Sequence, residues 1–121
     1  MSPRRLSQVR VLVVEDELIV ALHIEQLLGA YGCQLRWRES TFEGALATVL
    51  RYTPDVCLLD VDLNGVKSYP IAEVLERLQV PFAFVTGSGD GALATPWQKH
   101  AILKKPFVFA GMRTILDKLL L

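Results

Sequence analysis

The stretch Val56-Cys57-Leu58-Leu59-Asp60 decides the fold, because four apolar residues run without interruption and end on an acidic residue. An uninterrupted apolar run is typical of a strand that is buried on both faces, as in a parallel sheet covered by helices. Similar runs occupy residues 11–14, 82–85 and 101–103. We therefore expect four neighbouring parallel strands, whose carboxyl ends meet in one crevice.

Chemically active side chains follow these runs. Carboxylates follow two of them, a hydroxyl follows a third and an amine the fourth, at Glu15-Asp16, Asp60, Thr86 and Lys105. Each of these residues alone has an ordinary structural interpretation, as a turn residue, a helix cap or a solvated side chain. Together and in this order, they predict one pocket that suits a phosphoryl group held by carboxylates, a divalent cation, a hydroxyl and a lysine.

Between the apolar runs, hydrophobic residues recur at the spacing of one helix face. Strands are expected over 9–14, 34–38, 55–60 and 101–104, with a further one after Pro81. The alternation predicts a doubly wound α/β domain, a (βα)5 unit with a five-stranded parallel sheet and right-handed crossovers. The helical stripes are Val20, Ile24, Leu27 and Leu28; Phe42, Ala45, Leu46 and Val49; Ile71, Val74, Leu75 and Leu78; and Val108, Met112, Ile115 and Leu119.

Local signals indicate where these helices begin and end. Gly32 is expected to end the first helix in the left-handed conformation, and Ser40-Thr41-Phe42-Glu43 fits a capping box at the start of the second. Asn64-Gly65 predicts a turn, and Pro70 suits the first turn of the third helix. Pro96 leaves room for only a short fourth helix.

Length and composition restrict the function. The chain has 121 residues, and we expect residues 1–121 to form a single domain. Thirteen basic and thirteen acidic residues cancel, so nothing indicates a nucleic-acid partner. Cys33 and Cys57 have neither metal-binding nor redox spacing, and no uncharged stretch is long enough to span a bilayer. A cytoplasmic protein is therefore expected.

The acidic residues of the predicted pocket favour a metal site. Three carboxylates close together repel one another, and the pKa of at least one should rise unless a cation intervenes. Mg²⁺ prefers oxygen ligands and keeps several waters, which leaves positions for a phosphoryl oxygen. We expect Asp16 and Asp60 to be direct ligands and Glu15 to act through water. The main-chain carbonyl of Asp62 is a further candidate ligand.

Asp60 is also the candidate nucleophile. A carboxylate can accept a phosphoryl group and form an acyl phosphate, and a divalent cation neutralises the charge that spreads over the phosphoryl oxygens during transfer. Thr86 is expected to donate a hydrogen bond to one phosphoryl oxygen, and Lys105 to pair with another.

With these residues in place, the chain resembles the receiver domain of bacterial two-component response regulators over nearly its whole length. The resemblance is carried by Val13-Val14-Glu15-Asp16-Glu17, by Pro54-Asp55-Val56-Cys57-Leu58-Leu59-Asp60, by Thr86-Gly87 and by Lys105-Pro106-Phe107. It implies a flavodoxin-like receiver fold. It also implies a phosphorelay signalling protein that changes its partner-binding surface, and not an enzyme.

The resemblance further implies a role for each residue of the pocket. Asp60 would receive a phosphoryl group from a phosphohistidine on a histidine kinase or a histidine phosphotransfer protein, and Mg²⁺ would bind at Glu15, Asp16 and Asp60. Thr86 would move toward the phosphoryl group, and Lys105 would sense it. The phosphorylated protein would then act on a downstream protein partner or pass the phosphoryl group on.

Two segments refine the resemblance. Pro81–Gly87 is similar to the corresponding strand of a subgroup of stand-alone receivers tied to general stress signalling, with Val85 in place of the alanine of that subgroup. Ile102 is a departure, because many receivers have Tyr or Phe three residues before the lysine. The usual coupling between the threonine and an aromatic residue therefore lacks its aromatic half.

Other functions remain open on sequence grounds. Asp60-Val61-Asp62 after an apolar strand also fits a haloacid-dehalogenase-type phosphatase, but in that class the motif opens the domain, whereas here Glu15-Asp16 comes first. A degenerate receiver that acts only by binding a partner is the third hypothesis. The terminal Leu119-Leu120-Leu121 leaves open packing on the sheet, a homodimer contact and a chain cut from a longer regulator.

Overall fold

The sheet has five parallel strands in the order β2-β1-β3-β6-β7. The structure is a computed structural model that describes residues 5–87, 97, 100–105 and 107–120. This strand order is that of the flavodoxin-like doubly wound fold, so the predicted fold class is confirmed. The strands are β1 Arg10–Val14, β2 Gln34–Glu39, β3 Val56–Asp60, β6 Phe82–Thr86 and β7 Ile102–Lys104.

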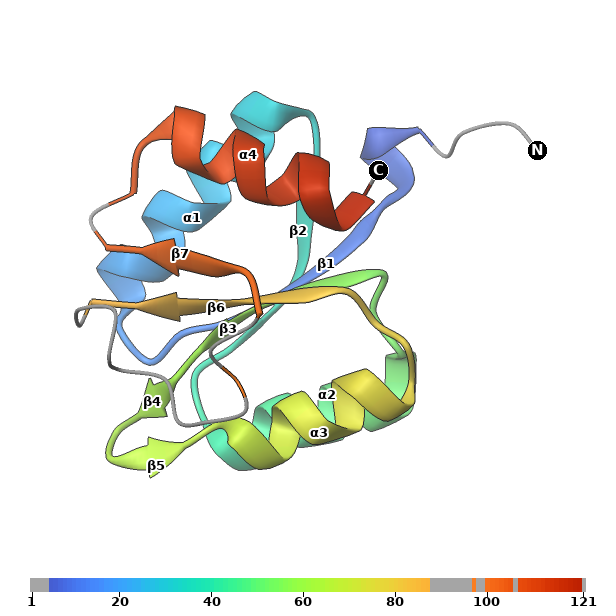
Figure 1. Cartoon of the computed structure of the whole chain (residues 1–121), viewed down its shortest axis with the longest axis vertical. Helices are drawn as coiled ribbons and strands as arrows, with labels where there is room; N and C mark the ends of the chain where they lie inside the picture. The colour runs from blue at the N-terminus through green and yellow to red at the C-terminus, as the bar shows by residue number, and fades with distance from the viewer. Residues whose placement is uncertain (1–4, 88–96, 98–99, 106, 121) are drawn as a thin grey trace.

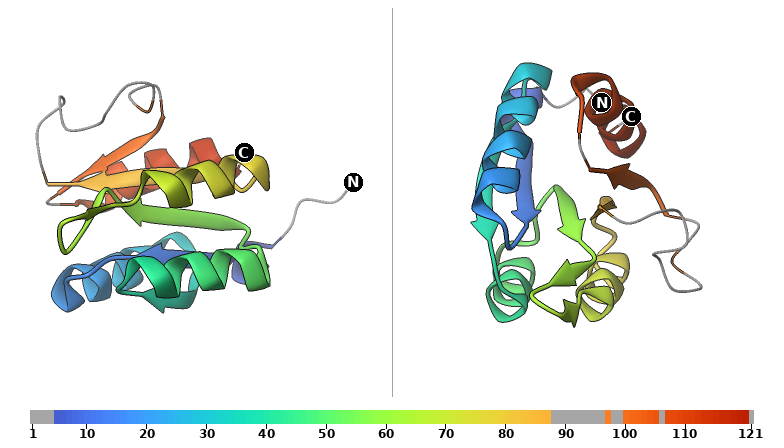
Figure 2. Two further views of the ribbon diagram at one scale, coloured as in Figure 1. Left: turned by 90° about the horizontal axis from the view of Figure 1, so that it is seen from below. Right: turned by 90° about the vertical axis from the view of Figure 1, so that its left-hand side faces the viewer.

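Helices cover both faces of this sheet (Figure 1, Figure 2). α1 Leu18–Tyr31 and α4 Phe109–Leu120 lie on one face, and α2 Phe42–Tyr52 and α3 Tyr69–Arg77 lie on the other. Because both faces are covered, almost every residue of β1, β3 and β6 is buried, which explains their uninterrupted apolar runs. None of the helices described is long and apolar enough to cross a membrane. The predicted short fourth helix near Pro96 falls outside the described residues.

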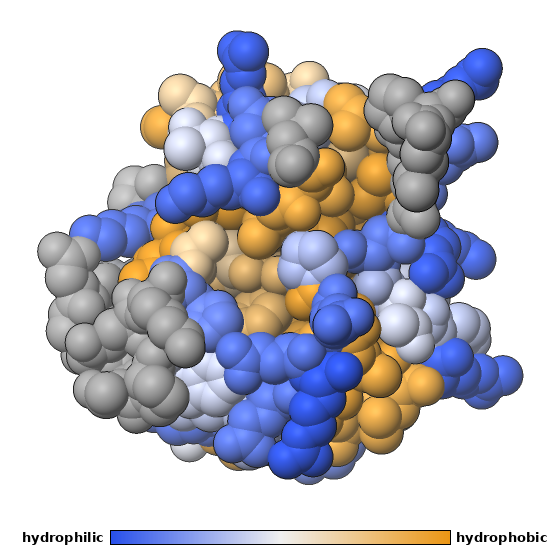
Figure 3. All heavy atoms as spheres, turned by 45° about the vertical axis from the view of Figure 1, so that its right-hand side comes forward, coloured by the Kyte–Doolittle hydropathy of each residue, from blue (hydrophilic) through white to orange (hydrophobic). Residues whose placement is uncertain are grey.

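The end of the sheet opposite the predicted pocket lacks the predicted site residues and has a second cavity. A cavity of about 480 Å³ lies there, lined by Phe82, His100 and Lys118 among others. Figure 3 shows apolar side chains gathered between the two helix layers on this side, with hydrophilic side chains around them. The polar residues that follow β1, β3, β6 and β7 lie at the other end, which is the end that the sequence predicted for the site.

The predicted glycine positions are confirmed. Gly32 ends α1 with a φ of 111°, in the left-handed region. Asn64 and Gly65 have φ values of 51° and 86°, as in a type I′ hairpin turn. They join two short antiparallel strands, β4 Asp62–Leu63 and β5 Val66–Lys67. These two strands were not predicted, because a strand of two residues leaves no periodic pattern.

The predicted capping box is wrong by one residue. α2 begins at Phe42, and its N-cap is Thr41 in place of Ser40. The Thr41 hydroxyl accepts a hydrogen bond from the N–H of Gly44 at 3.0 Å. Gly44 rather than Glu43 therefore occupies the third helical position, so Glu43 is not placed for the reciprocal bond of a capping box.

Two residues of the predicted helical stripes do not belong to the core. Leu78 is 39% exposed, because α3 ends at Arg77 and Gln79 turns the chain with a φ of 59°. Val108 precedes α4 and is 66% exposed. The other stripe residues are buried or half-buried against the sheet, so the predicted faces of the helices are otherwise confirmed.

One hydrogen bond joins the two helices of the α1–α4 face, and it can be tested. The Tyr31 hydroxyl donates to Asp117 Oδ1 at 2.6 Å. Tyr31→Phe is expected to lower the free energy of unfolding by about 1 kcal/mol in urea denaturation. Tyr52→Phe is the matched control, because the structure gives the Tyr52 hydroxyl no hydrogen bond with a described residue. A larger loss in the control would contradict this assignment.

The same bond predicts a pH dependence. Burial, followed by the bond to Asp117, raises the pKa of Tyr31 from 10.0 to about 12. A group whose pKa is raised by folding contributes stability that is complete below its unfolded pKa and is lost as the pH rises through its folded pKa. The difference between wild type and Tyr31→Phe should therefore disappear as the pH rises from 10 to about 12.

Candidate functional site

The predicted site residues converge at the carboxyl edge of the sheet. Asp60 is the last residue of β3 and Thr86 the last of β6, whereas Glu15 and Asp16 follow β1 and Lys105 follows β7. Because these strands are parallel neighbours, their ends bring the five side chains to one place. This convergence is what the sequence predicted.

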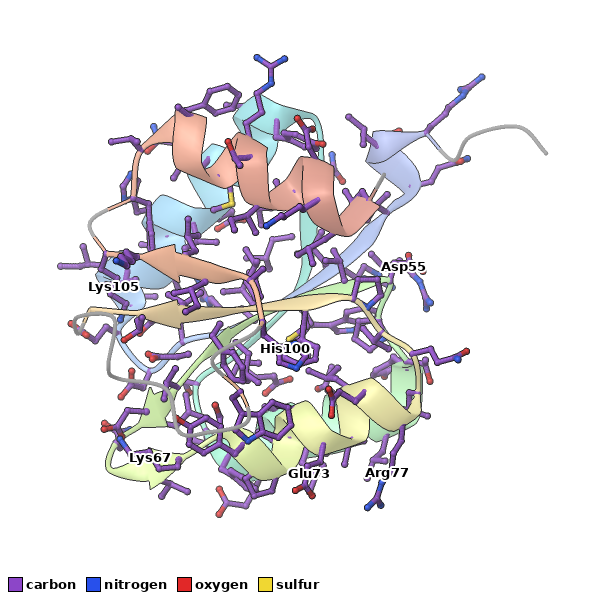
Figure 4. The ribbon with its side chains drawn as sticks, viewed as in Figure 1. Asp55, Lys67, Glu73, Arg77, His100 and Lys105 are labelled. Carbon is purple, nitrogen blue, oxygen red and sulfur yellow. The ribbon has the colours of Figure 1, made fainter. Side chains whose placement is uncertain are left out.

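A cavity of about 600 Å³ opens at this edge. Asp16, Asp60, Thr86 and Lys105 line it, and so does Lys67 of the β4–β5 hairpin. Figure 4 shows Lys105 and Lys67 at the same end of the molecule, far from Asp55 at the opposite end. The cavity is therefore acidic on its floor and carries a lysine on each of two segments at its rim.

Three carboxylates meet at the floor of the site, where Asp16 and Asp60 line the cavity and Glu15 is buried beside them. Glu15, Asp16 and Asp60 each offer an oxygen, and these three oxygens lie within 4.8 Å of one another. Glu15 is 2% exposed and Asp60 is 5% exposed. Oxygen ligands at this spacing suit a small, hard divalent cation that completes its shell with water. The donor set therefore fits Mg²⁺.

Glu15 is the residue that most needs a positive partner. Burial and the neighbouring charge of Asp60 raise the pKa of Glu15 from 4.5 to about 7, although the N–H of Glu17 donates a hydrogen bond to its Oε2 at 3.1 Å. Glu15 Oε1 is buried, and no described residue donates a well-directed hydrogen bond to it. An oxygen in this situation can be satisfied by a proton, a cation or a water bound to one.

Lys105 supplies the nearest positive charge. Its Nζ lies 3.1 Å from Glu15 Oε1, 3.5 Å from Asp60 Oδ2 and 3.8 Å from Glu17 Oε1. Burial alone would lower the pKa of Lys105, but the surrounding carboxylates outweigh it and raise the pKa. Burial raises the pKa of Asp60, and the positive charge of Lys105 opposes this effect. One lysine thus faces more negative charge than it can neutralise.

The β4–β5 hairpin closes the other side of the site with backbone donors. The N–H of Asn64 donates to Asp16 Oδ2 at 2.9 Å, and the N–H of Asp62 donates to Asp60 Oδ1 at 3.2 Å. Burial would raise the pKa of Asp16, but the hydrogen bonds around it, of which the bond from Asn64 is the largest, together outweigh burial, and the pKa is lowered. The hairpin therefore helps to keep Asp16 ionised.

Sequence reasoning missed the contribution of this hairpin. Lys67 Nζ lies 3.2 Å from Asp62 Oδ2, and both residues line the cavity. The signal that could have found Lys67 is the Asn64-Gly65 turn, because a two-residue turn pairs the residues that flank it. Lys67 then falls directly opposite Asp62.

Thr86 and Lys105 are linked through the backbone. Thr86 is 6% exposed, and its carbonyl accepts a hydrogen bond from the N–H of Lys105 at 2.8 Å. Ile102, the departure noted in the sequence, is half-buried and pairs with Phe84 across β6 and β7.

Comparison with known proteins gives relatives along almost the whole chain. SdrG from Sphingomonas melonis Fr1 is 34% identical and superimposes with a TM-score of 0.85, covering 95% of this chain and 98% of that one. Its BeF3-activated conformation, from Pseudomonas melonis Fr1, is 35% identical with a TM-score of 0.82 and full coverage of both chains. The response regulator REC domain of Erythrobacter litoralis PhyR is 25% identical, covers 93% of this chain and 89% of that one, and gives a TM-score of 0.74.

A curated protein agrees with these structures. The sensory transduction protein LytT of Bacillus subtilis is 30% identical over 94 residues, which are 77% of this chain. This chain spans 36% of the length of LytT. No protein-family profile matches the chain. The strand order, the acidic edge and the full-length similarity to SdrG together show that the chain belongs to the receiver domains of response regulators in two-component signalling.

Proposed function

We propose that residues 1–121 form one receiver domain that accepts a phosphoryl group on Asp60. The observation that carries this proposal is the position of Asp60, which is 5% exposed and yet lines the cavity at the carboxyl edge. Lys105 stands 3.5 Å from its Oδ2, and Thr86 lines the same cavity. A group transferred to Asp60 would therefore lie between a lysine and a hydroxyl.

The proposed reaction is a direct transfer between two side chains. An ionised Asp60 oxygen attacks the phosphorus of a phosphohistidine, the new O–P bond forms as the N–P bond breaks, and the imidazole leaves with the bonding electrons. Lys105 then pairs with one phosphoryl oxygen. Thr86 donates a hydrogen bond to another, and this bond holds the end of β6 toward the acyl phosphate.

The acidic floor is the proposed Mg²⁺ site. Asp16 and Asp60 would bind the ion directly, Glu15 would bind through water, and the main-chain carbonyl of Asp62 would be a further ligand. When bound, Mg²⁺ offsets the charge on the phosphoryl oxygens during transfer. Without it, three carboxylates and an incoming phosphoryl group would repel one another across this floor.

The surface beside the cavity supports a protein as the phosphodonor. Leu18, Ile19 and Leu22 of α1 are 58%, 83% and 47% exposed, and Val108 and Phe109 near the start of α4 are 66% and 39% exposed. Ile19 lines a small cavity together with Lys105 and Phe107, so exposed apolar surface lies directly beside the site, as at protein interaction surfaces. We infer that a histidine kinase or histidine phosphotransfer protein binds here in the cytoplasm and presents its phosphohistidine to Asp60. A downstream protein partner would then bind the phosphorylated form.

The proposed activity is signalling rather than turnover of a substrate. A phosphatase of the haloacid-dehalogenase type would need a second acidic pair late in the chain, whereas here Glu15 and Asp16 come first. The presence of Asp16, Asp60, Thr86 and Lys105 in one cavity favours a phosphoacceptor over a receiver that only binds a partner. We therefore expect no turnover of phosphate monoesters.

Phosphorylation of Asp60 can be measured by intact mass. With Mg²⁺ and acetyl phosphate, wild type is expected to gain one phosphoryl group and Asp60→Asn none, because an amide oxygen is a poor nucleophile. Asp62→Asn is the matched control, since only the main-chain carbonyl of Asp62 is assigned to the site. Equal labelling of wild type and Asp60→Asn would rule out Asp60 as the acceptor.

Lys105 is expected to affect phosphate sensing more than metal binding. Lys105→Ala removes a cation that competes with Mg²⁺ for Glu15 and Asp60, so calorimetry should show Mg²⁺ binding that is as tight as in wild type or tighter. The change in the amide NMR spectrum on adding beryllofluoride should be reduced. Lys118→Ala on the exposed side of α4 is the control. A parallel loss of Mg²⁺ binding and of the beryllofluoride response would contradict this role.

A further inference from the structure

Ser68 is a buried residue whose hydroxyl does not make the helix-capping hydrogen bond expected at its position. It is the N-cap of α3 and is 0% exposed, but its side chain caps no N–H of its own helix. An N-cap serine ordinarily accepts a hydrogen bond from the first turn. Here the hydroxyl donates to the main-chain carbonyl of Asp60 at 2.5 Å. A local rule broken at a buried position points to a functional constraint.

Ser68 is tied to the strand end and to the helix at once. Its N–H donates to the carbonyl of Val61 at 2.9 Å, and its own carbonyl accepts from the N–H groups of Ile71 and Ala72 at 2.9 and 3.2 Å. All these groups are part of one short hydrogen-bonded unit. A displacement of the Asp60 backbone would therefore displace the first turn of α3.

The residue after Ser68 extends this unit to Trp97. The ring of Tyr69 stacks on Trp97, with centroids 5.9 Å apart and an interplanar angle of 8°, and meets the edge of Phe84 at 5.8 Å. Trp97 is 8% exposed. The first residue of α3 thus holds Trp97 against the sheet.

A second contact joins α3 to His100. His100 Nε2 lies 3.0 Å from Glu76 Oε2, and the His100 ring stacks on Phe82 with centroids 4.9 Å apart. Figure 4 shows His100 between the sheet and α3. Trp97 and His100 are therefore both attached to α3, one at each end of the helix, so a shift of α3 would be felt by both.

We propose that Ser68 and Tyr69 couple the state of Asp60 to Trp97, so that phosphorylation repositions Trp97 and His100 through α3. Ser68 is a positioning residue in this account, because it touches the Asp60 backbone and does not line the cavity. The inference rests on the proposed phosphorylation of Asp60. It adds which part of the molecule responds and through which contacts.

The indole N–H signals of the two tryptophans provide the test. Trp97 reports on its contact with Tyr69 of α3, and Trp37, stacked on Tyr52 at the β2 edge, is an internal reference. The NMR probe is Mg²⁺ with beryllofluoride, which is a stable mimic of the phosphoryl group. Labelling by acetyl phosphate is measured separately by intact mass. In wild type we expect the Trp97 signal to move and the Trp37 signal to stay.

Two variants break the proposed coupling at different contacts. Ser68→Ala removes the hydroxyl, and Tyr69→Leu removes the stacked ring. Both should still gain a phosphoryl group but lose the shift of the Trp97 signal. Thr114→Ala is the matched control, because it also deletes a hydroxyl that donates to a carbonyl. Thr114 lies on the exposed side of α4. Its Trp97 shift should equal that of wild type.

Each result decides the proposal. A phosphorylated wild type with an unmoved Trp97 signal, or an undiminished shift in folded Ser68→Ala and Tyr69→Leu, would overturn the coupling and leave the phosphoacceptor role intact. A wild type that gains no phosphoryl group and binds no beryllofluoride would overturn both. If Ser68→Ala fails to fold, Tyr69→Leu decides alone.

Discussion

The crowding of three carboxylates at one end of a parallel sheet is the constraint on which the rest of this structure depends. Parallel pairing of β1 with β3 brings Glu15 and Asp16 beside Asp60, and Glu15 and Asp60 are almost fully buried there. The surroundings then counter the resulting charge. Lys105 approaches from β7, and backbone N–H groups approach from the β4–β5 hairpin. The proposed divalent cation would complete the same compensation.

The same constraint bears on the proposed function, because it would allow the site to act as a switch. Lys105 is shared among carboxylates in the structure as it stands, so a phosphoryl group on Asp60 would give it a new partner. A ligand shifts a conformational equilibrium only by its different affinity for the two states. Such a difference in affinity can arise at groups whose contacts involve Asp60. These are Lys105, which is shared between carboxylates, and the Ser68 hydroxyl, which donates to the Asp60 carbonyl.

The central strands and the convergence of five side chains could be predicted from sequence. Glu15, Asp16, Asp60, Thr86 and Lys105 each lie at or just after the end of an apolar run, and parallel topology brings these strand ends together whatever the details of packing. Lys67 was missed, because its place depends on a hairpin of two-residue strands whose sequence signal is the Asn64-Gly65 turn. The role of Ser68 could not be predicted either. An N-cap serine is expected to cap its own helix, whereas the Ser68 hydroxyl donates to the main-chain carbonyl of Asp60. Contacts that depend on tertiary position leave no mark in periodicity.

Thermal unfolding of the protein with and without Mg²⁺ at pH 6 and pH 8 tests the central claim most directly. The raised pKa of Glu15, about 7 against an ordinary 4.5, means that its contribution to stability is lost as the pH rises through about 7. The account predicts a lower midpoint at pH 8 without metal, a restoring effect of Mg²⁺ that is larger at pH 8 than at pH 6, and neither effect in Glu15→Gln. A midpoint at pH 8 that does not respond to Mg²⁺ would contradict it.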